Sequence, residues 1–151
     1  MESRLELKTK ANLGKRISAG LIDYGMVSIF TFGMFYFYGE PIEGGYTLTG
    51  YPFLIVILFW TFLTIGMEQI FGVTLGNYMS DLRAISAINY NDDRITFGQS
   101  VKRHLLAILD LWVFGLIGIL LIKNTKLNQR LGDIWAKTIV IDTTDKNQGV
   151  L

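Results

Sequence analysis

The stretch Arg16-Ile17-Ser18-Ala19-Gly20-Leu21-Ile22-Asp23 opens the first long apolar run of the chain. From Ile17 to Tyr38 the only ionised side chain is that of Asp23. About twenty apolar residues in a helix, each rising roughly 1.5 Å, are enough to cross a hydrocarbon core of roughly 30 Å. The stretch therefore predicts a membrane-spanning helix with one carboxylate inside it.

A carboxylate at this depth is unfavourable by at least about 2.5 kcal/mol, so a partner for Asp23 is expected. Arg16 lies seven residues earlier, close to two helical turns, and both side chains leave the helix on one face. The sequence therefore predicts a buried pair of Arg16 and Asp23. Two roles stay open, because burial and the nearby cation act on the acid in opposite directions. Asp23 is either a group that binds and releases a proton or one member of a permanent ion pair that fixes the helices.

The composition is typical of a small membrane protein with several spans. Of the 151 residues, 50% are hydrophobic and 18% are charged, and the mean hydropathy is +0.36. The net charge of +1 argues against a nucleic-acid partner, which would require a concentrated basic face. The chain has no cysteine, which excludes disulfides and thiolate metal sites. The length predicts one domain over residues 1–151.

The distribution of charge predicts the orientation of the first two spans. Residues 1–15 carry more cations than anions, which places the N-terminus in the cytoplasm. The first span is expected at 17–38, and the loop 39–51 has no lysine or arginine, as expected on the outer side. The second span is expected at 52–71. Glu68 then lies near its cytoplasmic end, where it either joins a site or simply marks the membrane exit.

The third apolar run, about 104–122, leaves two topologies open. As a single span it would place the C-terminal segment outside, but that segment is basic and so belongs in the cytoplasm. A broken helix that enters and leaves on the same side resolves the conflict, and Gly115 and Gly118 offer places for the break. We favour this re-entrant arrangement over a single span.

Short segments with strand character predict a small cytoplasmic β-sheet. They lie at about residues 82–88, 94–96 and 138–142. The expected fold class is an all-α membrane bundle of two full transmembrane helices plus a broken or re-entrant third helical segment, with this sheet attached. Residues 143–151 are expected to form a short polar tail.

The third apolar run begins with an arginine and an aspartate at the same spacing as Arg16 and Asp23. Arg103 is followed after six residues by Asp110, as Arg16 is by Asp23, and both pairs are expected to enter the membrane from the cytoplasmic side. The spacing suggests a degenerate parallel repeat in which two Arg–Asp helices face each other. The alternative is that the same spacing arose by chance.

Three ordered motifs stand out along the chain. They are Arg16, Ala19 and Ile22-Asp23, then Thr74-Leu75-Gly76 with Leu82-Arg83, and last Arg130-Leu131-Gly132-Asp133 with Ala136 and Thr138-Ile139-Val140. Together they resemble the RDD family of small bacterial membrane proteins, over roughly residues 12–142. The resemblance implies a place in the bacterial cytoplasmic (inner) membrane and a role in transport, for which cation/proton exchange is usually suggested. Asn77, Gly132 and Lys137 depart from the family pattern, which weakens any role for those side chains.

The predicted site gathers charged groups near the cytoplasmic face. The candidates for proton or ion coupling are Arg16, Asp23, Asp133, Glu68, Asp110, Arg103 and Arg130. Asp133, in a short cytoplasmic turn, is expected to cap a helix or to accept from an arginine. Oxygen ligands of this kind suit a hard cation, but their spacing does not demand one, and no metal or cofactor is predicted.

Two functions of different class follow. The sequence has no Walker loop, dinucleotide fingerprint, zinc-type histidine pair or nucleophile elbow, so an enzyme is not expected. The first function is transport of an ion, a proton or a small solute, along a path between the protomers of a homo-oligomer. The second is a non-transporting scaffold or accessory subunit that docks another membrane protein. The lipid bilayer is a partner in both.

Overall fold

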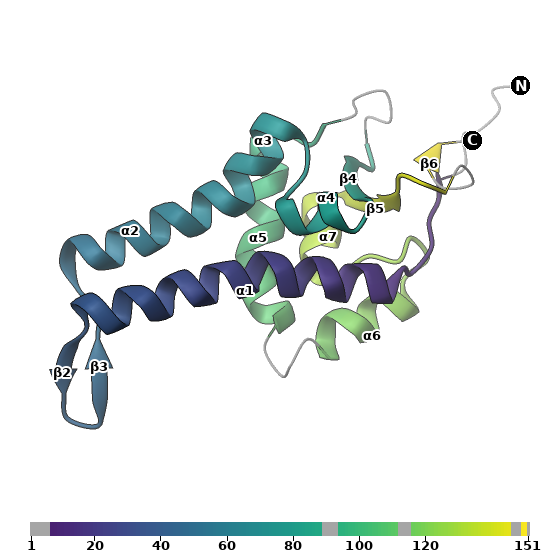
Figure 1. Cartoon of the computed structure of the whole chain (residues 1–151). Helices are drawn as coiled ribbons and strands as arrows, with labels where there is room; N and C mark the ends of the chain where they lie inside the picture. Colours follow the sequence, from purple (N-terminus) through teal and green to yellow (C-terminus); the bar gives the residue numbers. More distant parts are fainter. Residues whose placement is uncertain (1–6, 89–93, 112–115, 146–148, 151) are drawn as a thin grey trace, which may run out of the picture.

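The computed structural model describes residues 7–88, 94–111, 116–145 and 149–150. It consists of a long helical hairpin with a group of shorter elements packed on one end (Figure 1). The first arm of the hairpin is α1 (Leu13–Tyr38). The second arm runs through α2 (Gly50–Thr61), the π-helical turn η1 (Phe62–Gly66) and α3 (Met67–Phe71).

Both arms are long and apolar enough to cross a membrane. The 26-residue helix α1 contains a window of mean hydropathy 1.4, and the 22 residues from Gly50 to Phe71 contain one of 1.9. Only 11% and 22% of those windows are buried inside the molecule. A core helix of a water-soluble protein would be mostly buried, so these outward faces suit lipid. The two predicted spans are therefore confirmed as helices of spanning length and composition.

A short β-hairpin joins the two arms. β2 (Glu40–Ile42) pairs antiparallel with β3 (Gly45–Thr47). Gly44, in the turn between them, has a φ of +88°, a conformation that glycine adopts without strain. Between the arms themselves, Phe30 and Phe59 stack with ring centroids 4.0 Å apart. The hairpin and the aromatic pair keep the two arms side by side.

The remaining elements gather around the first half of α1 (Figure 1). They are α4 (Leu75–Met79), β4 (Leu82–Ser86), α5 (Phe97–Leu111), α6 (Leu116–Asn124), α7 (Leu131–Ala136), β5 (Thr138–Asp142) and the paired strands β1 (Leu7–Lys8) and β6 (Gly149–Val150). Strands β4 and β5 form an antiparallel two-stranded sheet. Buried apolar residues at the centre of this group are Ala19, Leu82, Ala84, Ile95 and Val140.

The predicted sheet is confirmed in part. The segments around 82–88 and 138–142 pair as β4 and β5, but the strand predicted at 94–96 is wrong. The Thr96 hydroxyl accepts from the backbone N–H of Gln99 at 3.3 Å, and the Gln99 side chain accepts from the backbone N–H of Thr96 at 3.0 Å. This reciprocal arrangement is a capping box. A β-branched residue that looked like part of a strand therefore starts helix α5.

The predicted third span at 104–122 corresponds to two helices, α5 and α6. Their described lengths of 15 and 9 residues are each below the roughly twenty needed for a span. Gly118 lies inside α6, so the break predicted there is wrong, and Gly115 lies outside the described residues. That this part of the chain enters and leaves the membrane on one side stays a prediction.

Candidate functional site

Asp23 is held by the first turn of α4. Its Oδ1 accepts from the backbone N–H of Gly76 at 2.7 Å, and its Oδ2 accepts from the Thr74 hydroxyl at 2.6 Å. Thr74 precedes α4 and caps it by accepting from the backbone N–H of Asn77 at 3.3 Å. Asp23 is only 7% exposed. Two neutral donors from another helix therefore compensate the carboxylate that the first span carries.

The predicted pair of Arg16 and Asp23 is wrong. Seven residues of helix separate the two side chains by about 10.5 Å along the axis, so closer donors satisfy the acid first. Arg16 has other partners: its Nη1 lies 3.4 Å from Asp133 Oδ2, and its Nη2 donates to the carbonyl of Val140 at 3.3 Å. Among the described residues, no cation forms an ion pair with Asp23.

Asp133 is the carboxylate that the arginines do surround. Arg103 Nε donates to its Oδ1 at 3.0 Å, Arg130 Nε lies 3.6 Å from the same oxygen, and the side chain is fully buried. The backbone N–H of Arg130 also donates to Oδ2 at 3.3 Å, at the start of α7. Burial alone would raise the pKa of Asp133, but the guanidinium groups of Arg130, Arg103 and Arg16 outweigh it and hold the pKa below its ordinary value. The prediction that Asp133 caps a helix or accepts from an arginine is confirmed in both parts.

Glu68 extends this network into the second arm of the hairpin. Its Oε1 accepts from Arg103 Nη1 at 2.7 Å, and its Oε2 accepts from the Ser100 hydroxyl at 2.5 Å. His104 Nε2 lies 3.1 Å from Oε2. Both members of the ion pair between Glu68 and Arg103 are 1% exposed. Glu68 follows the π-helical turn, a feature often found at functional sites.

Two glycines let the elements of the site approach closely. A Cβ on Gly76 would lie 2.1 Å from the carbonyl oxygen of Ala19, so α4 can meet α1 only without a side chain there. A Cβ on Gly132 would lie 2.6 Å from the carbonyl oxygen of Arg103, which fixes the contact of α7 with α5. The departure from the family pattern at Gly132 thus has a steric reason in this chain.

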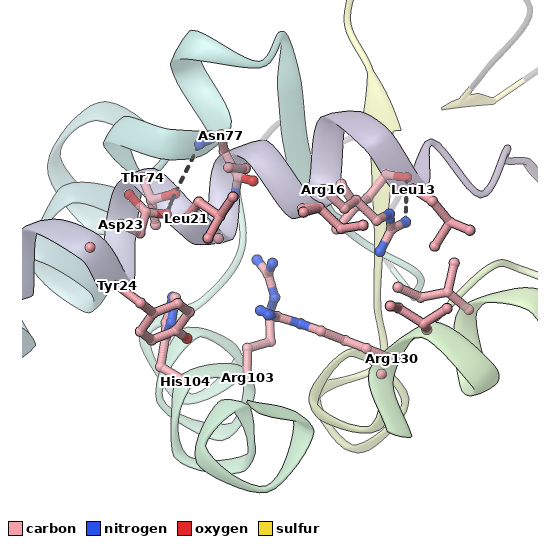
Figure 2. Close-up of a pocket in the computed structure, with 18 of the residues that line it drawn as sticks. Leu13, Arg16, Leu21, Asp23, Tyr24, Thr74, Asn77, Arg103, His104 and Arg130 are labelled. Carbon is pink, nitrogen blue, oxygen red and sulfur yellow. Dashed lines mark hydrogen bonds between the residues drawn. The ribbon is translucent and has the colours of Figure 1, made fainter. Parts of the chain in front are cut away.

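A cavity of about 430 Å³ lies between α1 and the shorter helices. Figure 2 shows Asp23, Arg16, Arg103, Arg130 and His104 drawn around it. Apolar side chains of α1 and α6 complete its walls. The charged groups of the site therefore border a space large enough for an ion or a small solute.

The sequence identified most of these residues as candidates. The structure brings Arg16, Asp23, Glu68, Arg103, Arg130 and Asp133 to the cavity or into contact with residues that line it. Asp110 belongs to α5, but its side chain lies outside the described residues, so the predicted repeat stays a prediction.

Thr74, Gly76, Ser100 and His104 belong to the site but were missed as site residues. Thr74 and Gly76 belong to one of the motifs quoted from the sequence, and this signal would have pointed to them. Ser100 carries no signal in the sequence. Within the part of the chain that the structure describes, no group of three or more metal-binding side chains is placed to hold an ion.

Comparisons with known proteins agree with the resemblance. A model of the RDD family matches residues 10–137, which is most of the chain. No curated protein and no solved structure matches it.

Proposed function

The chain belongs to the RDD family, and from this premise we propose that it is a bacterial membrane protein that moves an ion, a proton or a small solute across the bilayer. In this proposal Asp23 is the coupling carboxylate and the cavity is the access route. The membrane is the cytoplasmic (inner) membrane, with the N-terminus in the cytoplasm because the first fifteen residues are basic. The protein carries out no covalent chemistry on its substrate.

The environment of Asp23 is the observation that carries this proposal. Asp23 lines the cavity, and its two oxygens accept one hydrogen bond each, from Thr74 and from Gly76. A carboxylate offers about four acceptor positions, so capacity remains for a proton or a hard cation. Glu68 and Asp133 are held by arginines instead, which suits a structural role. Asp23 is therefore the acid best placed to change its state.

The path proposed runs between copies of the chain. Two membrane-length helices enclose too little volume for a continuous route by themselves. A closed homo-oligomer creates an interior at its symmetry axis, and the exposed apolar faces of the two arms are available to form it.

A flux assay in proteoliposomes tests the role of Asp23. The vesicles carry a lumenal pH dye, and a Na⁺ or K⁺ gradient is imposed. We expect the Asp23→Asn variant to reduce proton flux to the level of protein-free vesicles, because an amide neither titrates nor binds a cation strongly. Asparagine still accepts from the N–H of Gly76, so the fold is retained.

The control for this assay is Glu43→Gln, the same chemical change at an exposed position in the β-hairpin. We expect wild-type flux from it. Equal flux from wild type and Asp23→Asn, with both proteins folded, contradicts the coupling role.

The burial of the charged network favours a second candidate, a scaffold or accessory subunit without transport. Glu68, Arg103 and Asp133 are each at most 1% exposed and join three helices, as a structural clip would. In this candidate function a partner strand would pair with the outer edge of β4 in the two-stranded sheet of β4 and β5. This reading predicts no flux above background from the wild-type protein under any ion gradient.

A further inference from the structure

Three guanidinium groups meet at one part of the cavity. Arg16, Arg103 and Arg130 all border it, and Figure 2 shows their side chains around the same space. Within the described residues, the carboxylates in ion pairs with these groups are those of Glu68 and Asp133. Asp23 is a further carboxylate that lines the cavity. Three guanidinium groups bordering one space present many N–H donors, which suits an anion that carries several oxygens.

The acceptors of the Arg16 guanidinium are weak. Its contacts with Asp133 and with the Val140 carbonyl measure 3.4 and 3.3 Å, longer than the roughly 2.7–2.9 Å of a strong charge-assisted hydrogen bond. The Arg16 side chain is only 9% exposed, and its buried Nε has no hydrogen-bond partner among the described residues. A buried donor without an acceptor is unfavourable. An oxygen-rich anion in the cavity would supply the missing acceptors.

The walls beside the arginines are apolar and lead outward. The apolar part of the lining comes from α1 and α6 and includes Leu13, Ile17, Leu21, Ile119 and Ile122. Ile17 is 48% exposed and Leu21 is 70% exposed, so this wall continues onto the outer surface of a membrane-length helix. A charged pocket that opens along an apolar wall fits a molecule with an anionic head and a hydrocarbon tail.

We propose that the arginine-lined part of this cavity binds a phosphate oxyanion, held by Arg16, Arg103 and Arg130. The planar guanidinium group presents paired N–H donors that match the oxygens of phosphate. The phosphate belongs to a phospholipid headgroup, whose chains lie along the apolar wall, or it is free in solution; both sources present the same oxygens. The proposal goes beyond the transport role and does not depend on it, because Arg16 rather than Asp23 carries it.

Thermal unfolding of the full chain in dodecylmaltoside micelles tests the site. Phosphatidic acid is compared with diacylglycerol, which lacks only the phosphate, and inorganic phosphate is compared with chloride at equal ionic strength. A ligand that binds only the folded state raises Tm. We expect phosphatidic acid to raise Tm more than diacylglycerol does. A rise with inorganic phosphate as well assigns the site to the free anion, and a rise with the lipid alone assigns it to the headgroup.

Variants locate the effect. Arg16→Gln is expected to weaken the apparent affinity for the phosphate ligand at least about tenfold, because a charge-assisted interaction is lost. Lys123→Gln, an exposed cation at the end of α6, is the matched control and is expected to respond as wild type does. If Arg16→Gln does not fold, Arg130→Gln replaces it, because the Arg130 side chain is 22% exposed.

Two results overturn the proposal. One is a wild-type Tm that rises no more with phosphatidic acid than with diacylglycerol and no more with phosphate than with chloride. The other is an equal response from wild type and from the arginine variant. Asp23→Asn is expected to keep the phosphate response, so a failure of the transport role and a failure of this site are separable.

Discussion

Asp23 and Asp133 are two buried carboxylates of one region with opposite surroundings. Asp23 accepts from a hydroxyl and a backbone N–H, and both donors are neutral. Asp133 is surrounded by guanidinium groups from α1, from α5 and from Arg130, the residue before α7. A carboxylate enclosed by cations stays ionised, whereas one bound by neutral donors keeps the freedom to change its state. The division of roles between an adaptable acid and a structural one follows from these partners.

Replacing Asp133 is expected to be costly for stability. Asp133→Asn removes the negative charge that Arg16, Arg103 and Arg130 share, and so weakens the compensation of these buried cations. Breaking a buried pair in this way typically costs about 3–5 kcal/mol. The measurement is denaturant unfolding in micelles. Asp81→Asn, at a largely exposed side chain, is the control and should change little; equal losses in both variants would argue against the structural role of Asp133.

At the scale of the elements, two short helices, α4 and α7, are each positioned by contacts with a buried carboxylate. Helix α4 has only five residues, which is too few to be stable alone, and its first turn is fixed on α1 by Asp23. Helix α7 has six residues, and Asp133 in its first turn ties it to α5 and α1. Each short helix is therefore stabilised by tertiary contacts to a buried acid.

The contact between α4 and α1 is expected to be sensitive to one methyl group. Gly76→Ala places a Cβ 2.1 Å from the Ala19 carbonyl oxygen and 2.8 Å from Asp23 Cγ, so the helices must separate. Overpacking of this kind costs about 1–3 kcal/mol, and here it also disturbs both hydrogen bonds of Asp23. The checks are Tm in micelles and proton flux.

Gly33→Ala is the matched control, because a Cβ at Gly33 meets nothing within 4 Å and alanine favours the helix. It should lose neither stability nor flux. A Gly76→Ala protein that behaves the same way would show that α4 tolerates displacement from α1.

The whole molecule is an apolar helical hairpin with a group of charged residues at one end (Figure 1). We call this group, which consists of Arg16, Glu68, Arg103, Arg130 and Asp133, the charged junction. The hairpin arms expose their apolar faces, while the junction buries its charges between α1, α3, α5 and α7. Among the described residues, a small cluster of buried apolar side chains lies at this end of the molecule, and the buried ion pairs join the same elements. Conditions that neutralise the charged groups of the junction should therefore lower the stability of the whole fold.

Acid is expected to weaken the fold through Asp133. Because the pKa of Asp133 is lowered in the folded state, its ionised form contributes stability that is fully present above the unfolded value of about 3.9. This contribution is lost as the pH falls through the lower, folded value. The free energy of unfolding of the wild type should thus decline below about pH 4, and part of that decline should be missing in Asp133→Asn. Superimposable pH profiles of the two proteins would contradict this assignment.

The sequence by itself determined the membrane-length helices, the family and the identity of nearly all charged residues of the site. The reason is that these properties are local. Length and apolarity decide whether a segment can cross a bilayer, and an ionised group in such a segment requires compensation wherever its partner comes from. The same local reasoning failed at Thr96, because a helix cap and a short strand use the same residue type.

The tertiary structure alone decided which groups compensate one another. Arg16 meets Asp133, which is 117 residues away, and Asp23 meets Thr74 and Gly76, which are 51 and 53 residues away. Sequence spacing shows only that two side chains share a helix face. Arg16 and Asp23 are separated by about 10.5 Å along the helix axis, so the donors at the start of α4 are closer to Asp23 than Arg16 is. Partners are selected by which helix end arrives within hydrogen-bond distance, and that depends on close approaches such as the one at Gly76, which no local pattern encodes.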